Sequence, residues 1–353
     1  MFKSVLSLTL AAALGTASFG QTTLTAVPGE AAAAKYASIS QEILRAIEKG
    51  NEYLKSKQNP EGYWAQPSYP ALTALAVTAY MRDPANQGKP VPEYIRKGYD
   101  FILKSQKEDG SIFNRGMSSY NTAVCMMALL AANKEEYAPA ILKGRAYLIK
   151  QQNHFAPDNP YNGGIGYGDK QAPPIADLSN TSLALEAIYY SQKLAKDGKY
   201  GEQPDLDWNA ATEFINRCQQ NPAVNKEPWV SNDKSQLGGF VYRPGVSSAR
   251  DKKSAAFDKA EPPKAYGSMT YAGMQSLIYA NVDKNDPRVK LALKWLENSY
   301  SLDENPGMGV QGLYYYYQAM SKALSAMGID TLTLENGRKV DWRDELANKL
   351  ISI

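Results

Sequence analysis

The chain repeats a short pattern that constrains its fold more than any other feature does. The segment from Tyr53 to Trp64, YLKSKQNPEGYW, returns at residues 101–113 as FILKSQKEDGSIF, so that Gln58 recurs as Gln106. In each copy an amphipathic stretch precedes the glutamine, and an almost wholly apolar stretch follows the turn. Such a repeat indicates units that bury their apolar faces against one another.

The apolar periodicity predicts one outer and one inner helix in each repeat. Before Gln106 the pairs Tyr94/Ile95, Gly98/Tyr99 and Ile102/Leu103 recur every four residues and mark one buried face. The stretch 122–132 that follows is apolar all round, so that helix must be covered on every side. Counterparts are 71–81, 177–191, 268–280 and 313–327 for inner helices, and 141–152, 208–219, 287–300 and a stretch from Trp342 for outer ones. We therefore expect an all-α fold with an inner and an outer layer of helices.

The repeated turns carry a family resemblance. Gln58-x-x-x-Gly62-Tyr63-Trp64, Gln106-x-x-x-Gly110 with Phe113, and the Gly-Gly-aromatic turns near 163–167 and 238–240 resemble the repeats of squalene cyclases and protein prenyltransferase β-subunits. The resemblance spans 42–353 and implies an α/α toroid, a barrel-like ring of helical hairpins. In that family the glutamine ties down backbone at helix ends and the aromatic residue packs on the next repeat. The resemblance thus implies structural roles for Gln58, Trp64, Gln106 and Phe113.

The N-terminal residues have the order of a secretory signal peptide. Lys3 precedes an apolar run at 5–14 and small residues up to Gly20, which predicts a signal peptide at 1–20. The run is shorter than the ~20 apolar residues of a membrane span. We expect an exported, periplasmic or extracellular protein that does not span the membrane, with a flexible segment at 21–37 and one repeat domain at 38–353.

The last repeat is incomplete. The outer helix predicted from Trp342 is the sixth, and the sequence stops at Ile353, where the next turn would begin. Either the sequence stops short, which we favour because a missing inner helix would expose apolar surface, or the toroid closes with five hairpins and one unpaired outer helix.

The charge of the chain bears on its partners, and its two cysteines bear on a possible disulfide bond. The formal net charge is +3, from 39 basic and 36 acidic residues of interspersed sign. This balance argues against a nucleic-acid partner. Cys125 and Cys218 lack the spacing of a disulfide framework, and whether they pair stays open.

The sequence lacks the catalytic motifs that the resemblance would supply. An Asp-x-Asp-Asp cluster is expected of an alkene-protonating cyclase, but the nearest string, Asp205-Leu206-Asp207-Trp208, lacks the last aspartate and opens an outer helix. A prenyltransferase zinc needs a carboxylate, a thiolate and an imidazole. The sole histidine, His154, lies in a predicted loop with neither cysteine near it in sequence. We predict no metal and no cofactor, and we leave catalysis open.

Polar residues gather where the inner helices begin. In a toroid these ends converge at the mouth of a central cavity, where free N–H groups favour anionic or carbonyl ligands. Asp177 is the acid among them and the candidate proton donor. The candidate ligand-binding residues are Ser119, Tyr120, Asn121, Asn180, Thr181, Thr270, Tyr271, Gln311 and Tyr314. Alternatively, Ser119, Asp177 or Ser179, and Ser268 are ordinary N-caps.

Four consecutive tyrosines lie on the last inner helix. The side chains of Tyr314 to Tyr317 cover more than half of the circumference of the helix. At least one of them should therefore face the cavity, and others should face the outer layer. Aromatic walls suit an apolar isoprenoid or lipid ligand, whereas core packing is the structural alternative. Three functions stay open: an apolar-ligand-binding member of the superfamily, a non-catalytic scaffold, and a glycan-active lyase or hydrolase, a class that α/α toroids also host.

Overall fold

The computed structural model describes residues 30–168, 175–249 and 262–353. Within these ranges the chain forms eleven α-helices and one pair of short strands, which confirms the all-α prediction apart from that pair. The predicted signal peptide and residues 21–29 lie outside the described residues. Helix α2 (Glu30–Ser56) begins before the domain start that we placed at Ser38.

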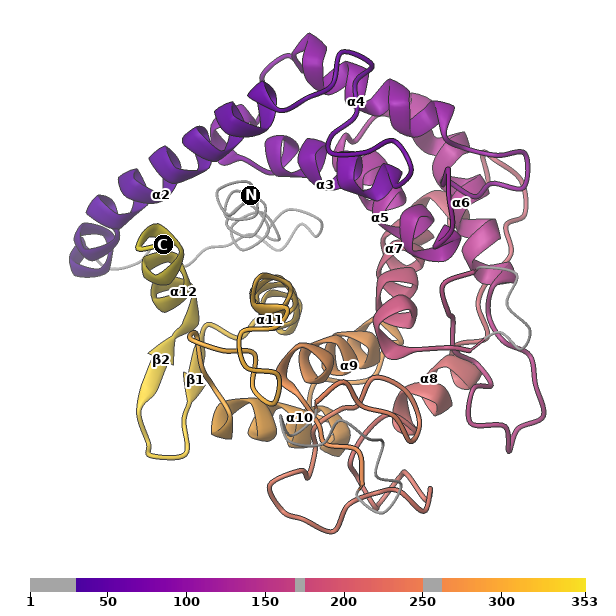
Figure 1. Cartoon of the computed structure of the whole chain (residues 1–353), viewed down its shortest axis with the longest axis vertical. Coiled ribbons are helices and arrows are strands. Elements are labelled where there is room, and N and C mark those ends of the chain that lie inside the picture. The colour runs from indigo at the N-terminus through magenta and orange to yellow at the C-terminus, as the bar shows by residue number, and fades with distance from the viewer. Residues whose placement is uncertain (1–29, 169–174, 250–261) are drawn as a thin grey trace.

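Five helices form the inner layer. They are α3 (Pro70–Met81), α5 (Ser118–Ala131), α7 (Leu178–Lys196), α9 (Gly267–Tyr279) and α11 (Leu313–Met327). Each packs on the next along the chain, and Figure 1 shows them inside an arc of outer helices. Helix α3 buries Ala71, Ala74, Ala76, Val77 and Ala79, which point in different directions around the helix, as the apolar sequence predicts.

The outer layer alternates with the inner one along the chain. It contains α2, α4 (Glu93–Lys104), α6 (Ala138–Lys150), α8 (Trp208–Asn216), α10 (Pro287–Asn298) and α12 (Trp342–Ile351), with the 3-10 turns η2 (Pro84–Asn86) and η3 (Glu135–Tyr137). Helix α4 packs on α3, α6 on α5 and α7, and α8 and α10 on α9. Helix α4 buries Ile95, Tyr99 and Ile102 on one face, as predicted. The first and last described helices, α2 and α12, contact each other.

A short antiparallel hairpin precedes α12 and was not predicted. Strand β1 (Thr331–Thr333) pairs with β2 (Lys339–Asp341), and Leu332 lies opposite Val340. Both of these side chains are buried. The hairpin therefore contributes to the core, and its second strand leads directly into α12.

A glutamine closes each of the first four turns between an outer and an inner helix. Gln58 Nε2 donates to Gly62 O (2.9 Å) and to Tyr94 O (2.7 Å), which belongs to the next outer helix. Three further glutamines repeat this pair of bonds: Gln106 to Gly110 O and Ala140 O, Gln152 to Gly163 O and Asp207 O, and Gln219 to Gly238 O and Arg288 O. We call these four side chains the glutamine clamps.

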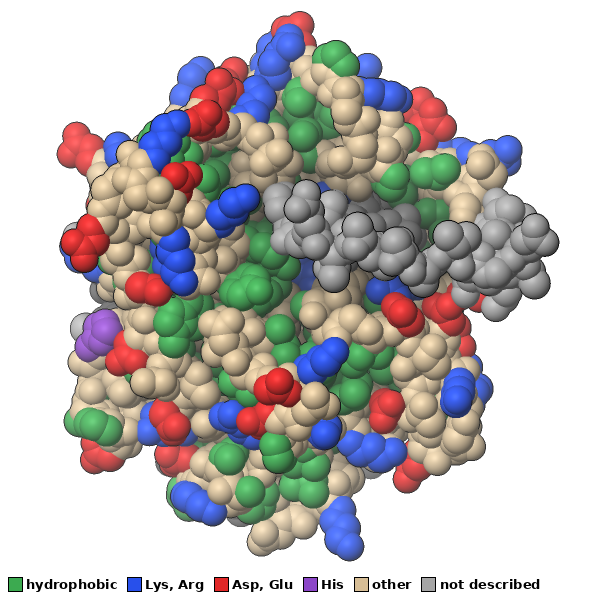
Figure 2. All heavy atoms as spheres, turned by 180° about the vertical axis from the view of Figure 1, so that it is seen from behind, with side chains coloured by type: hydrophobic (Ala, Val, Ile, Leu, Met, Phe, Trp, Pro, Cys, Tyr) green, Lys and Arg blue, Asp and Glu red, His purple; other side chains and the backbone are tan. Residues whose placement is uncertain are grey.

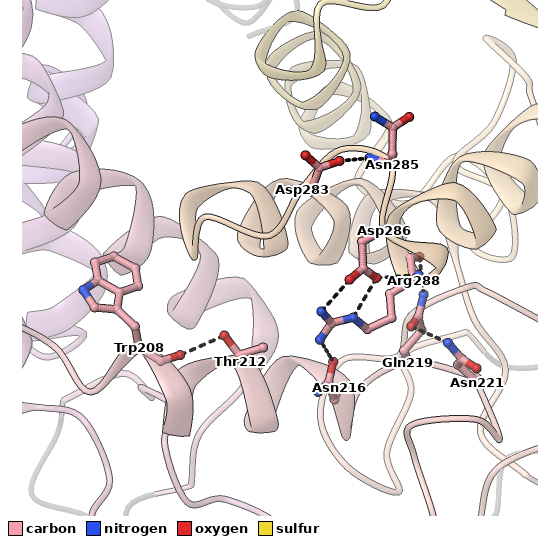
Figure 3. A network of polar contacts seen from close by, with 9 residues as sticks. All are labelled: Trp208, Thr212, Asn216, Gln219, Asn221, Asp283, Asn285, Asp286 and Arg288. Carbon is pink, nitrogen blue, oxygen red and sulfur yellow. Dashed lines mark hydrogen bonds and ion pairs between the residues drawn. The ribbon is translucent and has the colours of Figure 1, made fainter.

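The fourth clamp meets the start of the next outer helix in a small polar network. Gln219 reaches Arg288 O at the beginning of α10 (Figure 3). The Arg288 guanidinium is held by Asp286 and by Asn216 Oδ1. In the fifth repeat a tyrosine follows the outer helix instead: Tyr300 OH donates to Glu345 Oε2 of α12 over 3.1 Å. The link to the next outer helix is thus kept with a different residue.

The clamped glycines lie against backbone. Gly110 has a φ of 90°, and a Cβ there would lie 2.2 Å from Lys143 O. Gly62, Gly163 and Gly238 have similar positive φ values and equally close carbonyls. Glycine is required for this approach between repeats.

A threonine of the inner helix completes each of these four turns. The backbone N–H groups of Trp64, Ile112, Ile165 and Phe240 donate to the hydroxyls of Thr73, Thr122, Thr181 and Thr270, respectively. Structural roles for Gln58, Trp64 and Gln106 are therefore confirmed. The role given to Phe113 was wrong, because buried Ile112 takes the place equivalent to Trp64 while Phe113 stays partly exposed beside Lys107.

Candidate functional site

A cavity of about 270 Å³ lies among the inner helices α3, α5, α7 and α11. Its apolar lining consists of Leu75, Ala79, Val124, Met127 and Leu183. Its polar lining consists of Thr78, Arg82, Tyr120, Ser179, Glu186, Tyr315, Gln318 and Lys322. The site thus draws on four different repeats, which only the curvature of the inner layer brings together.

Two polar contacts join α7 to α11 across the cavity at different levels. At the start of both helices Ser179 Oγ lies 3.2 Å from Tyr315 OH. About two turns further along both helices, Lys322 Nζ lies 2.8 Å from Glu186 Oε2. Because both contacts advance in the same direction, the two helices run parallel, and the contacts are roughly 10 Å apart along them. A hydroxyl level and a charged level therefore bracket the apolar lining.

The charged level holds an ion pair largely removed from water. The side chains of Glu186 and Lys322 are 5% and 15% exposed, respectively. Arg82, at the C-cap of α3, also lines the cavity. Its Nε is buried without a hydrogen-bond partner, and it forms no ion pair with the described carboxylates. This end of the cavity thus carries one cation more than anions.

The hydroxyl level is neutral at ordinary pH. Burial raises the pKa of Tyr315 to about 12 and raises the pKa of Tyr120 above its usual value. Both phenols therefore keep their protons, and with Ser179 they offer hydroxyl groups that both donate and accept hydrogen bonds. Tyr315 thus faces the cavity, as we expected of at least one member of the Tyr314–Tyr317 run, whereas Tyr314, the candidate ligand-binding residue, does not line it.

The three neighbouring tyrosines do not line the cavity. Tyr316 OH donates to Ser301 O (3.0 Å) and Tyr317 OH donates to Leu302 O, in the segment after α10. Tyr314 meets Tyr317 edge to face. The four aromatic side chains therefore serve both the cavity and the core.

Asp177, the candidate proton donor, caps α7. Its Oδ1 accepts from the Asn180 backbone N–H (2.8 Å) and its Oδ2 from Asn180 Nδ2 (2.7 Å). The residue is 2% exposed, and burial raises the pKa of its carboxyl to about 6. Asp177 is not among the residues that line the cavity. The capping interpretation is therefore confirmed for Asp177.

The capping interpretation fails for two of the serines. Helix α5 begins after Met117 and α9 after Tyr266, and neither start has a side-chain cap. Ser119 and Ser268 lie inside these helices. The Ser119 backbone N–H donates to Tyr167 O, so the segment between α6 and α7 satisfies it without a side-chain cap.

Most of the other predicted ligand-binding residues have structural partners. The hydroxyls of Thr181 and Thr270 complete the repeated turns. Asn121 Oδ1 accepts from Ala71 N at the start of α3 over 3.1 Å. Tyr271 is fully buried and packs on Tyr316. Gln311 is exposed at the start of α11. Tyr120 is the one predicted residue that lines the cavity.

The sequence interpretation missed the charged level altogether. It considered only the starts of the inner helices, whereas Glu186 and Lys322 lie in the middle of α7 and α11, and Arg82 lies at the end of α3. A signal was present, because Glu186 and Lys322 each lie among apolar residues in the middle of an inner helix. A charged side chain inside such a helix must be paired or functional.

The residues considered for other chemistry lie elsewhere. Asp205 accepts from the buried Arg145 guanidinium (2.7 Å), and Asp207 caps α8. Cys125 and Cys218 are buried and unpaired, and His154 is exposed. In the described part of the chain, no three His, Cys, Asp or Glu side chains are grouped as metal ligands.

On the face opposite to that of Figure 1, basic and acidic side chains are mixed, and hydrophobic side chains gather near the centre (Figure 2). Among the described helices, none has the length and apolar character needed to cross a bilayer. No protein-family model matches the chain.

Proposed function

We propose that this protein is an exported α/α-toroid repeat protein of the squalene cyclase and protein prenyltransferase superfamily. Its function would be to bind a small apolar ligand, of the isoprenoid or lipid class, in the cavity among α3, α5, α7 and α11. The observation that carries the proposal is the apolar wall between two polar levels. Ligand pockets typically combine such walls with a few polar groups that orient the ligand.

Support for the superfamily comes from the repeated turns. Four glutamine clamps make the same two bonds, to their own turn and to the next outer helix. Alternation of inner and outer helices along the chain is the arrangement that the resemblance implies. The contact between α2 and α12 is the one expected of a ring.

The size of the cavity limits the ligand. A volume of about 270 Å³ holds about nine waters at ~30 Å³ each. It lies just below the ~300–1,000 Å³ that is usual for ligand pockets. A ten-carbon isoprenoid therefore fits better than a triterpene. The proposal stops at binding, because the candidate acid Asp177 does not line the cavity.

Calorimetric titration with geraniol, a neutral ten-carbon isoprenoid alcohol, tests this proposal. Leu183→Trp would fill the cavity from its α7 wall and should weaken binding at least tenfold. Leu237→Trp is the matched control, because Leu237 is exposed at a distance from the lining. Absence of geraniol binding to the wild-type protein, or equal binding to both variants, would contradict the proposal.

A further inference from the structure

The charged end of the cavity contains a cation without a counter-ion. Lys322 is neutralised by Glu186 at 2.8 Å. Arg82 forms no ion pair with any carboxylate of the described residues, and its Nε is buried without a partner. Arg82 as a whole is only partly buried, but a buried N–H group normally has a hydrogen-bond acceptor, because leaving it without one is costly. An anion in the cavity would supply the missing partner.

The position of Arg82 at the end of a helix does not by itself compensate for the missing hydrogen-bond partner of its Nε. A cation at a helix C-terminus interacts favourably with the helix dipole, and Arg82 is the C-cap residue of α3. That interaction does not satisfy the buried Nε, which needs a hydrogen-bond acceptor. The described carboxylate that shares this cavity, Glu186, is already paired with Lys322.

We infer that the ligand of this cavity is a monoanionic carboxylate with a short apolar chain, and that Arg82 binds its carboxylate group. This inference rests on the proposed function and specifies the ligand class. The guanidinium matches a carboxylate, which it can bind through two parallel N–H···O bonds. The chain of the ligand would lie along Leu75, Val124 and Leu183, toward Ser179 and Tyr315.

The charges favour a single negative charge over a diphosphate. One unbalanced cation offsets one negative charge, and Glu186 in the same lining would repel any further one. Like charges close together in a partly desolvated site are unfavourable. A carboxylate also adds little volume to a cavity of about 270 Å³.

Three ligands with the same carbon skeleton test this inference by calorimetry at pH 7. Geranic acid is the carboxylate, geraniol is its neutral counterpart, and geranyl diphosphate carries several charges. Wild-type protein should bind geranate at least tenfold more tightly than either of the other two. This comparison needs no variant and so does not depend on the folding of one.

Variants then assign the effect to Arg82. Arg82→Met should remove the preference for geranate over geraniol, and a thermal unfolding midpoint close to that of the wild-type protein shows that the variant is folded. Arg82→Lys keeps the positive charge but cannot form two parallel hydrogen bonds to a carboxylate, so it should retain part of the preference for geranate. Arg115→Met is the control, because Arg115 is exposed and outside the lining.

The outcomes separate this inference from the function on which it rests. Equal affinity for geranate and geraniol, or tighter binding of the diphosphate, overturns the carboxylate inference and leaves the apolar cavity intact. A preference that survives in Arg82→Met overturns the assignment to Arg82. Failure of the wild-type protein to bind any of the three ligands overturns both proposals.

Discussion

Lys322 of α11 and Glu186 of α7 form an ion pair, with Nζ and Oε2 2.8 Å apart, across a cavity that separates their helices. The pair lies about two turns beyond the contact between Ser179 and Tyr315 on the same two helices. It therefore joins distant repeats and sets the polar end of the cavity.

Breaking this pair should destabilise the fold. Lys322→Met leaves the Glu186 carboxylate buried without a partner and should lower the free energy of unfolding by about 3 kcal/mol. Adding Glu186→Leu removes the second charge and should restore most of the loss, because apolar replacements of buried pairs are often neutral. Urea denaturation at pH 7 measures both changes.

The exposed pair Glu93–Lys97 provides the control for that prediction. Glu93→Gln should change the free energy of unfolding by less than about 0.5 kcal/mol, as is usual for surface pairs. If Lys322→Met is as mild as this control, the pair does not have the structural role given to it.

The glutamine clamps predict that removing one of these side chains, which do not line the cavity, will lower the free energy of unfolding. Gln152 is 4% exposed, donates to Gly163 O and Asp207 O, and accepts from Asp207 N. Gln152→Met leaves these groups without partners and should cost about 3 kcal/mol. Exposed Gln41→Met should cost less than about 0.5 kcal/mol. Equal chemical denaturation midpoints for the two variants would be inconsistent with the clamp.

Alanine substitutions at two glycines distinguish the cost of backbone strain from the cost of a steric clash between repeats. Gly88 and Gly110 both have positive φ, but a Cβ at Gly88 meets nothing within 4 Å. Gly88→Ala should therefore cost only the ~1 kcal/mol of a left-handed alanine. Gly110→Ala should cost a further 1–3 kcal/mol, roughly, because its Cβ meets Lys143 O. Thermal unfolding of both variants tests the difference, and an equal loss would argue against close contact between repeats.

Asp177 should make stability depend on pH. Burial raises the pKa of its carboxyl from 3.8 to about 6, so the folded state keeps the proton to higher pH than the unfolded state does. Its contribution is full below pH 3.8 and is lost as the pH rises through about 6. Asp177→Asn keeps the N-cap and cannot ionise. At pH 7 it should be the more stable form by up to about 3 kcal/mol.

Denaturation of wild type and Asp177→Asn at several pH values checks this prediction. The difference between them should be small near pH 3.5 and should grow up to pH 7. A constant difference over this range would show that the Asp177 carboxyl does not titrate as stated. The comparison cancels groups that titrate equally in both proteins.

The layered helices could be predicted from sequence because each helix carries a local signal. Inner helices are rich in apolar residues, and α11 was predicted with its observed bounds, Leu313–Met327. The second turn was placed one residue late, because Phe113 looked like the equivalent of Trp64 although buried Ile112 is. The hairpin at 331–341 was missed although Asn336-Gly337 between alternating apolar residues is a strong turn signal.

The site was harder to predict because the cavity depends on the relation between distant repeats. Nothing local in the sequence places Arg82 near Lys322, since their helices are consecutive neither in sequence nor in the layer. The prediction placed the ligand-binding residues at the polar starts of the inner helices. There, however, the side chains of Asn121 and Thr181 form hydrogen bonds with neighbouring backbone. A search for charged residues inside apolar helices would have found Glu186 and Lys322.

A crystal structure of the protein grown with saturating geraniol tests the central claim most directly. The account predicts electron density for the ligand among α3, α5, α7 and α11, with its chain against Leu75, Val124 and Leu183 and no density there in Leu183→Trp. A cavity that contains only water while geraniol is bound elsewhere on the protein would contradict it.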